Sequence, residues 1–228
     1  MTALSVYDKA VQLQNRVRQI AEGEVGEKEA DRVLGRVKEL GVALADFRTQ
    51  FGVSRELARL GAAELPDLTA VEAARTAFER KARVGLPANP VFNTARRKIE
   101  ESTDTLRSAN SEAWSSWASG KLAELPLARI PMLPPDDRAV ARARAKELQQ
   151  AIASKSLSKS TIVLFTGTYE LLAESLQGKS DPPEELLSLL TRLESRPSPT
   201  LRDITDSDIA LLRRFEMDTY ITLQRTAA

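Results

Sequence analysis

Apolar side chains recur at alternating steps of three and four residues in two stretches near the N-terminus. The two stripes are Ala3, Val6, Ala10, Leu13, Val17 and Ile20, and then Val33, Val37, Leu40, Leu44, Phe47 and Phe51. This spacing places each stripe on one face of a helix, in the heptad register of a coiled coil. Continuing the first register reaches Glu24, Glu27 and Asp31, so that stripe is interrupted near Gly23 and Gly26. The pattern predicts an antiparallel helical hairpin.

Helix-capping signals divide the next part of the chain. Ser54 lies two residues after Gly52 and is expected to cap a short helix that ends near Leu65. Thr69 with Glu72 has the spacing of a capping box, which predicts a helix over residues 69–84. A Pro-Asn-Pro turn comes next, and a long helix is expected to open at residue 93 or 94.

Prolines mark a division of the chain. Four of them fall within residues 126–135, and such a density is typical of a semi-rigid linker. The predicted domains are therefore a helical hairpin and bundle region over residues 1–125 and a smaller, charge-segregated helical region over residues 136–228.

The second region also has helical patterns. A helix is predicted over residues 136–153. Residues 160–177 begin with the β-branched run Thr161-Ile162-Val163, which favours a strand, but apolar residues then keep helical spacing as far as Leu176, so we predict a helix.

Capping signals and a terminal apolar run complete this region. Asp181 is expected to cap the helix that follows two prolines, and Thr205 with Asp208 to cap a last short helix. Residues 220–223 are compatible with one short C-terminal strand. The whole pattern predicts an all-α protein, a helical bundle of about eight helices.

Composition excludes several kinds of chemistry. The 228 residues contain no histidine and no cysteine, so the chain cannot form a Ser-His-Asp triad, a Cys-His pair, a disulfide, or a zinc site with imidazole or thiolate ligands. No apolar run has the length of a membrane span and none near the N-terminus has the form of a signal peptide. We expect a cytoplasmic protein with no membrane partner. The abundance of Ala, Leu and Arg is typical of a bacterial chain.

Three local patterns imitate catalytic or metal sites. Residues 173–180 match a phosphate-binding loop except that alanine replaces its first glycine and a helical register runs through the segment. Asp67 and Glu79 have the order of a nuclease motif, but the predicted helix separates them. Glu100 and Asp104 lie one turn apart, where neighbouring arginines can pair with them. The sequence therefore predicts no catalytic residue, no cofactor and no metal, and no enzyme.

The formal net charge of +1 conceals two opposed segments. Residues 138–159 contain six basic and one acidic side chain, a net charge of +5, whereas residues 160–208 contain nine acidic and four basic side chains, a net charge of −5. Four basic residues gather at the start of the first segment: Arg138, Arg142, Arg144 and Lys146. They are expected to pair with the acidic segment of this chain or with a protein partner; the alternative is the phosphates of a nucleic acid.

Trp114 and Trp117 are the remaining candidates for a partner surface, because tryptophan is enriched at interface hot spots; core packing is the alternative. Together these features predict a non-enzymatic interaction or scaffold protein, a component or accessory subunit of a larger bacterial assembly. We expect association with a protein partner or with itself, abolished by disruption of Leu40 or Leu44. The alternative function is that of a nucleic-acid-associated factor using residues 138–159.

Overall fold

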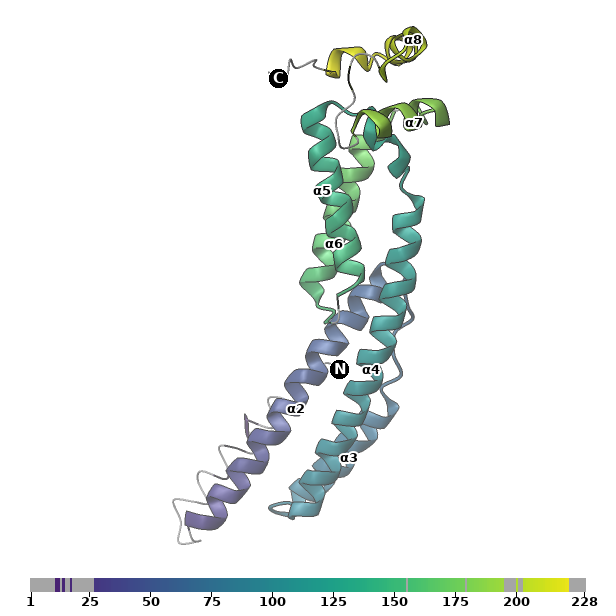
Figure 1. Cartoon of the computed structure of the whole chain (residues 1–228). Coiled ribbons are helices and arrows are strands. Elements are labelled where there is room, and N and C mark those ends of the chain that lie inside the picture. Colours follow the sequence, from purple (N-terminus) through teal and green to yellow (C-terminus); the bar gives the residue numbers. More distant parts are fainter. Residues whose placement is uncertain are drawn as a thin grey trace. The chain divides into compact units, whose positions relative to one another are not determined.

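The computed structural model describes residues 27–154, 156–178, 180–194 and 203–221, together with the single positions 11, 12, 14, 17 and 200. Within this part of the chain the secondary structure is helical and contains no strand (Figure 1). The all-α prediction is confirmed. The chain divides into two compact units: unit 1 is Met1–Trp117 with Lys155–Ile162, and unit 2 is Ala118–Ser154 with Val163–Ala228.

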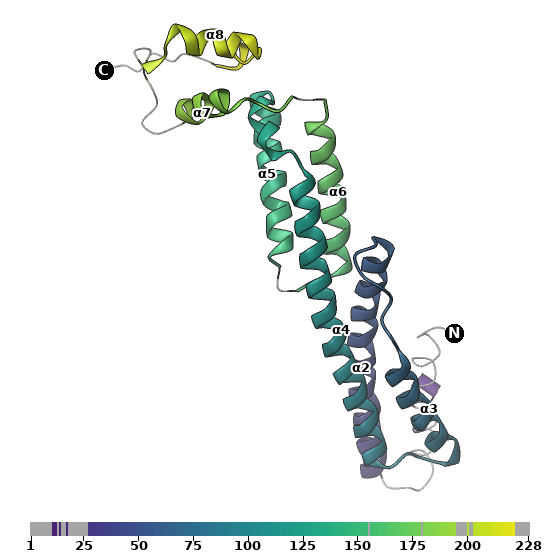
Figure 2. The same cartoon turned by 90° about the vertical axis from the view of Figure 1, so that its right-hand side faces the viewer.

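Unit 1 is built on three helices: α2 (Glu27–Arg59), α3 (Thr69–Val84) and the part of α4 (Asn89–Glu124) that ends at Trp117. Helices α2 and α4 lie side by side and run in the same direction (Figures 1 and 2). Helix α3, which comes between them in the sequence, runs back in the opposite direction. Two exposed ion pairs, Arg96 with Glu39 and Arg107 with Asp46, agree with this parallel register.

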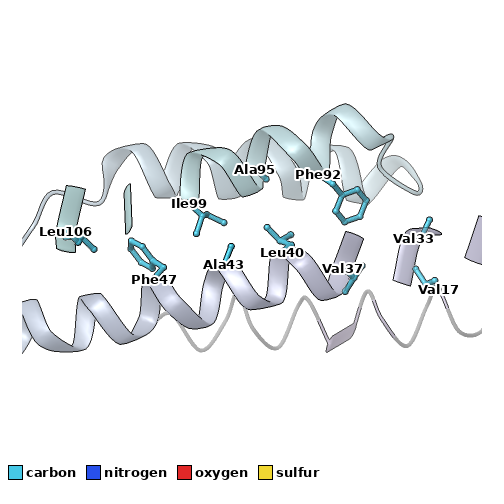
Figure 3. Close-up of a cluster of buried hydrophobic side chains, with 10 residues drawn as sticks. All are labelled: Val17, Val33, Val37, Leu40, Ala43, Phe47, Phe92, Ala95, Ile99 and Leu106. Atoms are coloured by element: carbon cyan, nitrogen blue, oxygen red, sulfur yellow. The ribbon is translucent and has the colours of Figure 1, made fainter. Parts of the chain in front are cut away.

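The second apolar stripe forms the core of unit 1. Val33, Val37, Leu40 and Phe47 are buried against the α4 residues Phe92, Ala95, Ile99 and Leu106 (Figure 3). The predicted hairpin paired this stripe with residues 3–20, most of which lie outside the described residues. Val17, which is described, is buried in the same cluster. In the described part of unit 1, α2 therefore packs on α4, and the residues that bond across the two helices are 56 to 61 positions apart in the sequence.

The predicted cap at Ser54 is wrong. Helix α2 continues through this position to Arg59. The Ser54 hydroxyl lies within hydrogen-bond distance of the Asn110 Oδ1 atom of α4 (2.8 Å) and of the Gln50 carbonyl oxygen (3.2 Å), so it does not cap a helix N-terminus. Gly61, two residues after the last residue of the helix, has φ 69°, and the Ala62 amide donates to the Leu57 carbonyl oxygen. This left-handed turn suits a glycine.

The α3 helix spans the predicted residues, but its cap differs. Asp67 Oδ1 accepts hydrogen bonds from the Thr69 amide (2.9 Å) and the Thr69 hydroxyl (2.5 Å), and these bonds hold the pKa of Asp67 below its ordinary value. Thr69 thus donates to a preceding carboxylate rather than capping the helix with Glu72. Helix α4 likewise begins earlier than expected, at Asn89, because proline is tolerated in a first helical turn.

Unit 2 contains the end of α4 and shorter helices. They are η1 (Leu127–Met132), α5 (Pro135–Ile152), α6 (Lys159–Leu176, from Val163 onward), α7 (Glu184–Leu193), α8 (Asp206–Arg214) and η3 (Asp218–Tyr220). The predicted helix at residues 160–177 is confirmed. Phe165, Leu172 and Leu176 are buried at helical spacing, so packing overrides the strand propensity of the segment.

The proline-rich segment is packed against its surroundings. Residues Leu127–Met132 form a 3-10 helix next to α5, and Ile130 and Leu133 are buried. The boundaries of the two compact units fall elsewhere along the chain, after Trp117, Ser154 and Ile162. The division into domains at residues 126–135 stays a prediction.

Helix α7, helix α8 and Met217, which follows α8, share a small apolar cluster of Leu186, Leu189, Leu190, Leu212 and Met217. The capping box of Thr205 with Asp208 is confirmed, and the hydrogen bonds that Asp208 accepts from Thr205 lower the pKa of Asp208.

Two other predictions for this region are wrong at the positions that the structure describes. Asp181 does not cap α7, since α7 begins after Pro183 and Asp181 pairs with Arg129 at 2.6 Å. Tyr220 lies in η3, which corrects the start of the expected strand; residues 222 and 223 lie outside the described residues.

Candidate interaction surfaces

The carboxylates that imitate catalytic sites are held in other contacts. Glu79 pairs with Arg75 at 2.8 Å, Glu100 lies 3.6 Å from Arg96, and Asp104 pairs with Arg107 at 2.5 Å. The Asp67 carboxylate accepts a hydrogen bond from the Thr69 amide at the start of α3. In the part of the chain that the structure describes, no three Asp or Glu side chains converge as metal ligands would.

The segment that imitates a phosphate-binding loop is the end of a helix. Its first residues belong to α6, and Gly178 has φ 74°, the left-handed conformation of a residue that follows a helix. Lys179 lies outside the described residues. The described geometry corresponds to a helix C-cap.

Two of the four predicted basic residues pair with the acidic segment of their own chain. Glu194, at the end of α7, accepts hydrogen bonds from Arg138 Nη1 at 3.2 Å and from Arg142 Nη2 at 2.7 and 2.9 Å. The Arg138 side chain is only 14% exposed, and its Nη2 atom also donates to the Leu133 carbonyl oxygen at 3.1 Å. These contacts join α5, α7 and the proline-rich segment, and leave two fewer free charges for phosphate binding.

The other basic residues of the segment have separate fates. Arg144 Nη1 lies 3.4 Å from the Leu171 carbonyl oxygen of α6. Lys146 is exposed and has no polar partner within the described residues. Lys159 pairs at 3.3 Å with Glu56 inside unit 1, and Lys155 lies outside the described residues. The segment is therefore not one continuous basic ridge.

The two tryptophans lie at the end of unit 1. Their ring centroids are 5.8 Å apart. Trp114 is buried, which agrees with core packing rather than with a free hot spot, whereas Trp117 is half-buried.

A surface that sequence analysis missed lies on the hairpin of α5 and α6. We name it the α5–α6 face and define it by Val140, Val163, Leu164, Gly167 and Leu171. Leu164 is 69% exposed and Leu171 is 50% exposed, and Val163 and Val140 are exposed as well. Helix α6 is thus apolar on two sides, of which only one is buried. The available signal was the apolar run from Ile162 to Phe165, which exceeds what one buried face needs.

Gly167 lies within this face, and the space next to its Cα atom is unoccupied. A Cβ atom added there would meet nothing within 4 Å. Glycine inside a helix is less favourable than alanine by about 1 kcal/mol, and no contact inside the described chain requires it.

Comparison with protein-family models, curated proteins and solved structures gave no match. Among the described residues, no helix has the length and apolar composition that crossing a bilayer requires. The surfaces above are therefore interpreted from their own chemistry.

Proposed function

We propose that this chain is a non-enzymatic helical interaction protein, a component or accessory subunit of a larger bacterial assembly in the cytoplasm. Its partner docks on the α5–α6 face. The observation that carries the proposal is the exposure of Leu164 and Leu171, with Val163, along one side of an ordered helix. Single exposed apolar residues are ordinary on soluble proteins, whereas contiguous ones mark interaction sites.

The chemistry of the face favours an amphipathic helix as its occupant. The apolar side chains follow helical spacing along α6, so they match a partner whose apolar residues recur at the same steps. Gly167 lies in the middle of this stripe and leaves room for a partner backbone to come close.

The edges of the stripe specify the charge of the partner. Glu170 and Glu174 follow one edge of the exposed side of α6 and have no polar partner within the described residues. A partner helix with Lys or Arg along its flank would pair with them, and such rim charges govern specificity and association rate more than affinity.

The test is affinity purification from the source cell with a photo-activatable residue at Thr168. We expect one defined protein to be cross-linked by the wild type and lost from the double variant Leu164→Asp, Leu171→Asp. Val42→Asp is the matched control, because Val42 is a 65% exposed apolar residue of unit 1. It should retain the cross-link.

Two results contradict the proposal. One is a wild type that remains monomeric and cross-links nothing; the other is an equal cross-link from both variants. Cross-linking between two copies of the chain would identify self-association as the function of the face. Leu40 is buried and Leu44 packs against the core of unit 1. Substitutions at these two residues therefore test folding and not association with a partner.

A further inference from the structure

The last residues of α3 and the turn that leads to α4 combine exposed apolar and basic side chains. We name it the α3–α4 tip and define it by Arg80, Lys81, Arg83, Val84 and Leu86. Val84 is 90% exposed, the largest fraction among the large apolar side chains that the structure describes, and Leu86 is 44% exposed. The turn lies where α3 ends and α4 begins, at one end of these two helices (Figure 2).

The cations of the tip are unpaired within the part of the chain that the structure describes. Arg80, Lys81 and Arg83 have no ionic or hydrogen-bond partner within the described residues. The next basic residues, Arg96, Arg97 and Lys98, all pair with glutamates. No acidic residue occurs between Glu79 and Glu100, so the segment that forms the tip carries three positive charges and no negative one.

We propose that the α3–α4 tip docks unit 1 on the surface of an anionic phospholipid bilayer. Val84 and Leu86 enter the boundary between headgroups and acyl chains, and the three cations lie at the level of the lipid phosphates. Apolar burial and attraction of basic residues to anionic lipids are the two terms that hold proteins at this boundary. The aliphatic stems of Arg and Lys extend the apolar contact while their charged ends stay in the polar layer.

The geometry favours a lipid surface over other anionic partners. A nucleic acid would use the cations but would leave Val84 and Leu86 in contact with water and phosphate. An acidic protein segment would need a groove for its backbone, and a Cβ added at Gly85, between the two apolar residues, would meet nothing within 4 Å. A fluid surface accommodates two protruding side chains without a preformed groove.

Surface docking replaces the expectation that membranes take no part in the function. It requires no spanning helix, so it agrees with the lack of one among the described residues. It is also independent of the α5–α6 face, because the tip belongs to unit 1 and that face belongs to unit 2.

The experiment is co-sedimentation of the full chain with phosphatidylcholine vesicles that contain or lack phosphatidylglycerol. We expect binding only to the anionic vesicles, weakening as salt screens the charges. Lys81→Glu should weaken it by more than about fivefold, the effect of one basic residue near such a surface. Val84→Asp with Leu86→Asp should abolish it. Melting temperatures close to the wild type would show that these exposed positions do not affect folding.

Lys146→Glu is the matched charge control, since Lys146 is an exposed cation of unit 2 without a polar partner in the described part of the chain. It should retain binding. The proposal is overturned if the wild type ignores anionic vesicles, if Lys146→Glu weakens binding as much as Lys81→Glu, or if the apolar double variant binds normally. It is also overturned if the tip prefers DNA or an acidic peptide to the vesicles. The variant Leu164→Asp, Leu171→Asp should bind vesicles normally, which separates this test from that of the α5–α6 face.

Discussion

The two basic regions of this molecule have opposite fates. In α5, Arg138 and Arg142 are held by Glu194, which follows them by 56 and 52 residues. At the α3–α4 tip, Arg80, Lys81 and Arg83 remain unpaired within the described residues. The α5 segment has a larger excess of positive charge in the sequence than the tip does, yet more of its basic side chains are paired with carboxylates. A basic run therefore indicates a partner surface only after the acidic residues that fold against it are known.

The largest expected effect concerns a buried polar residue that bonds across α2 and α4. Asn110 is buried, accepts from Ser54 and donates to the Gln50 carbonyl oxygen at 3.0 Å. Asn110→Ala should lower the free energy of unfolding by about 2–3 kcal/mol, because it leaves buried partners unsatisfied. Denaturant unfolding measures this change. The exposed neighbour variant Ser111→Ala should change stability by less than about 0.5 kcal/mol, and equal effects would show that the network does not hold α2 to α4.

Replacing one arginine in each basic region compares how much the two regions contribute to stability. Arg138→Ala should destabilise the protein by about 1–2 kcal/mol, because it removes a nearly buried side chain that contacts Glu194 and Leu133. Arg80→Ala should stay within about 0.5 kcal/mol, as is usual for an exposed side chain. Denaturant unfolding of both variants under one set of conditions tests this difference. Similar losses would mean that pairing does not distinguish the two regions.

Glu194→Gln should make the α5 region resemble the tip. Loss of the carboxylate frees Arg138 and Arg142, so the variant should elute from a cation exchanger at higher salt than the wild type. The cost in stability should be at most about 1 kcal/mol, because the ion pairs are partly exposed. Glu185→Gln removes the same charge from an exposed site of α7. If the two variants elute together, the arginines of α5 are not shielded by Glu194.

The smallest expected effect is on pH dependence. A hydrogen bond from Arg59 and an ion pair with Lys159 hold the pKa of Glu56 below its ordinary value. A lowered pKa in the folded state means that the contribution to stability is present above the unfolded value, about pH 4.3. It is lost as the pH falls through the lower, folded value. Thermal unfolding between neutral and acid pH should show a shallower loss for Glu56→Gln than for the wild type, and identical profiles would contradict this assignment.

Much of the secondary structure was predictable because helical signals are local. The helix at residues 160–177 and the cap of Thr205 with Asp208 follow from spacing over three and four residues. The helix at residues 69–84 spans the predicted residues although the capping box that indicated it does not form. Ser54 failed for a nonlocal reason, since a partner in α4 lies within reach of its hydroxyl. The α5–α6 face was missed because periodicity identifies the buried side of α6 but does not show that its other side stays uncovered.

The sequence alone determined that the chain is helical and that it lacks imidazole and thiol chemistry, because both follow from residue identity and short-range spacing. Tertiary structure decided which helices pack against each other. The contacts between α2 and α4 join residues 56 to 61 positions apart, and Glu194 joins α7 to α5 over a similar distance. A pairing over such a separation depends on the chain path and on packing, and an isolated surface ion pair contributes too little free energy to select its own partner. For this reason the paired arginines of α5 and the unpaired cations of the α3–α4 tip differ only once the chain is folded.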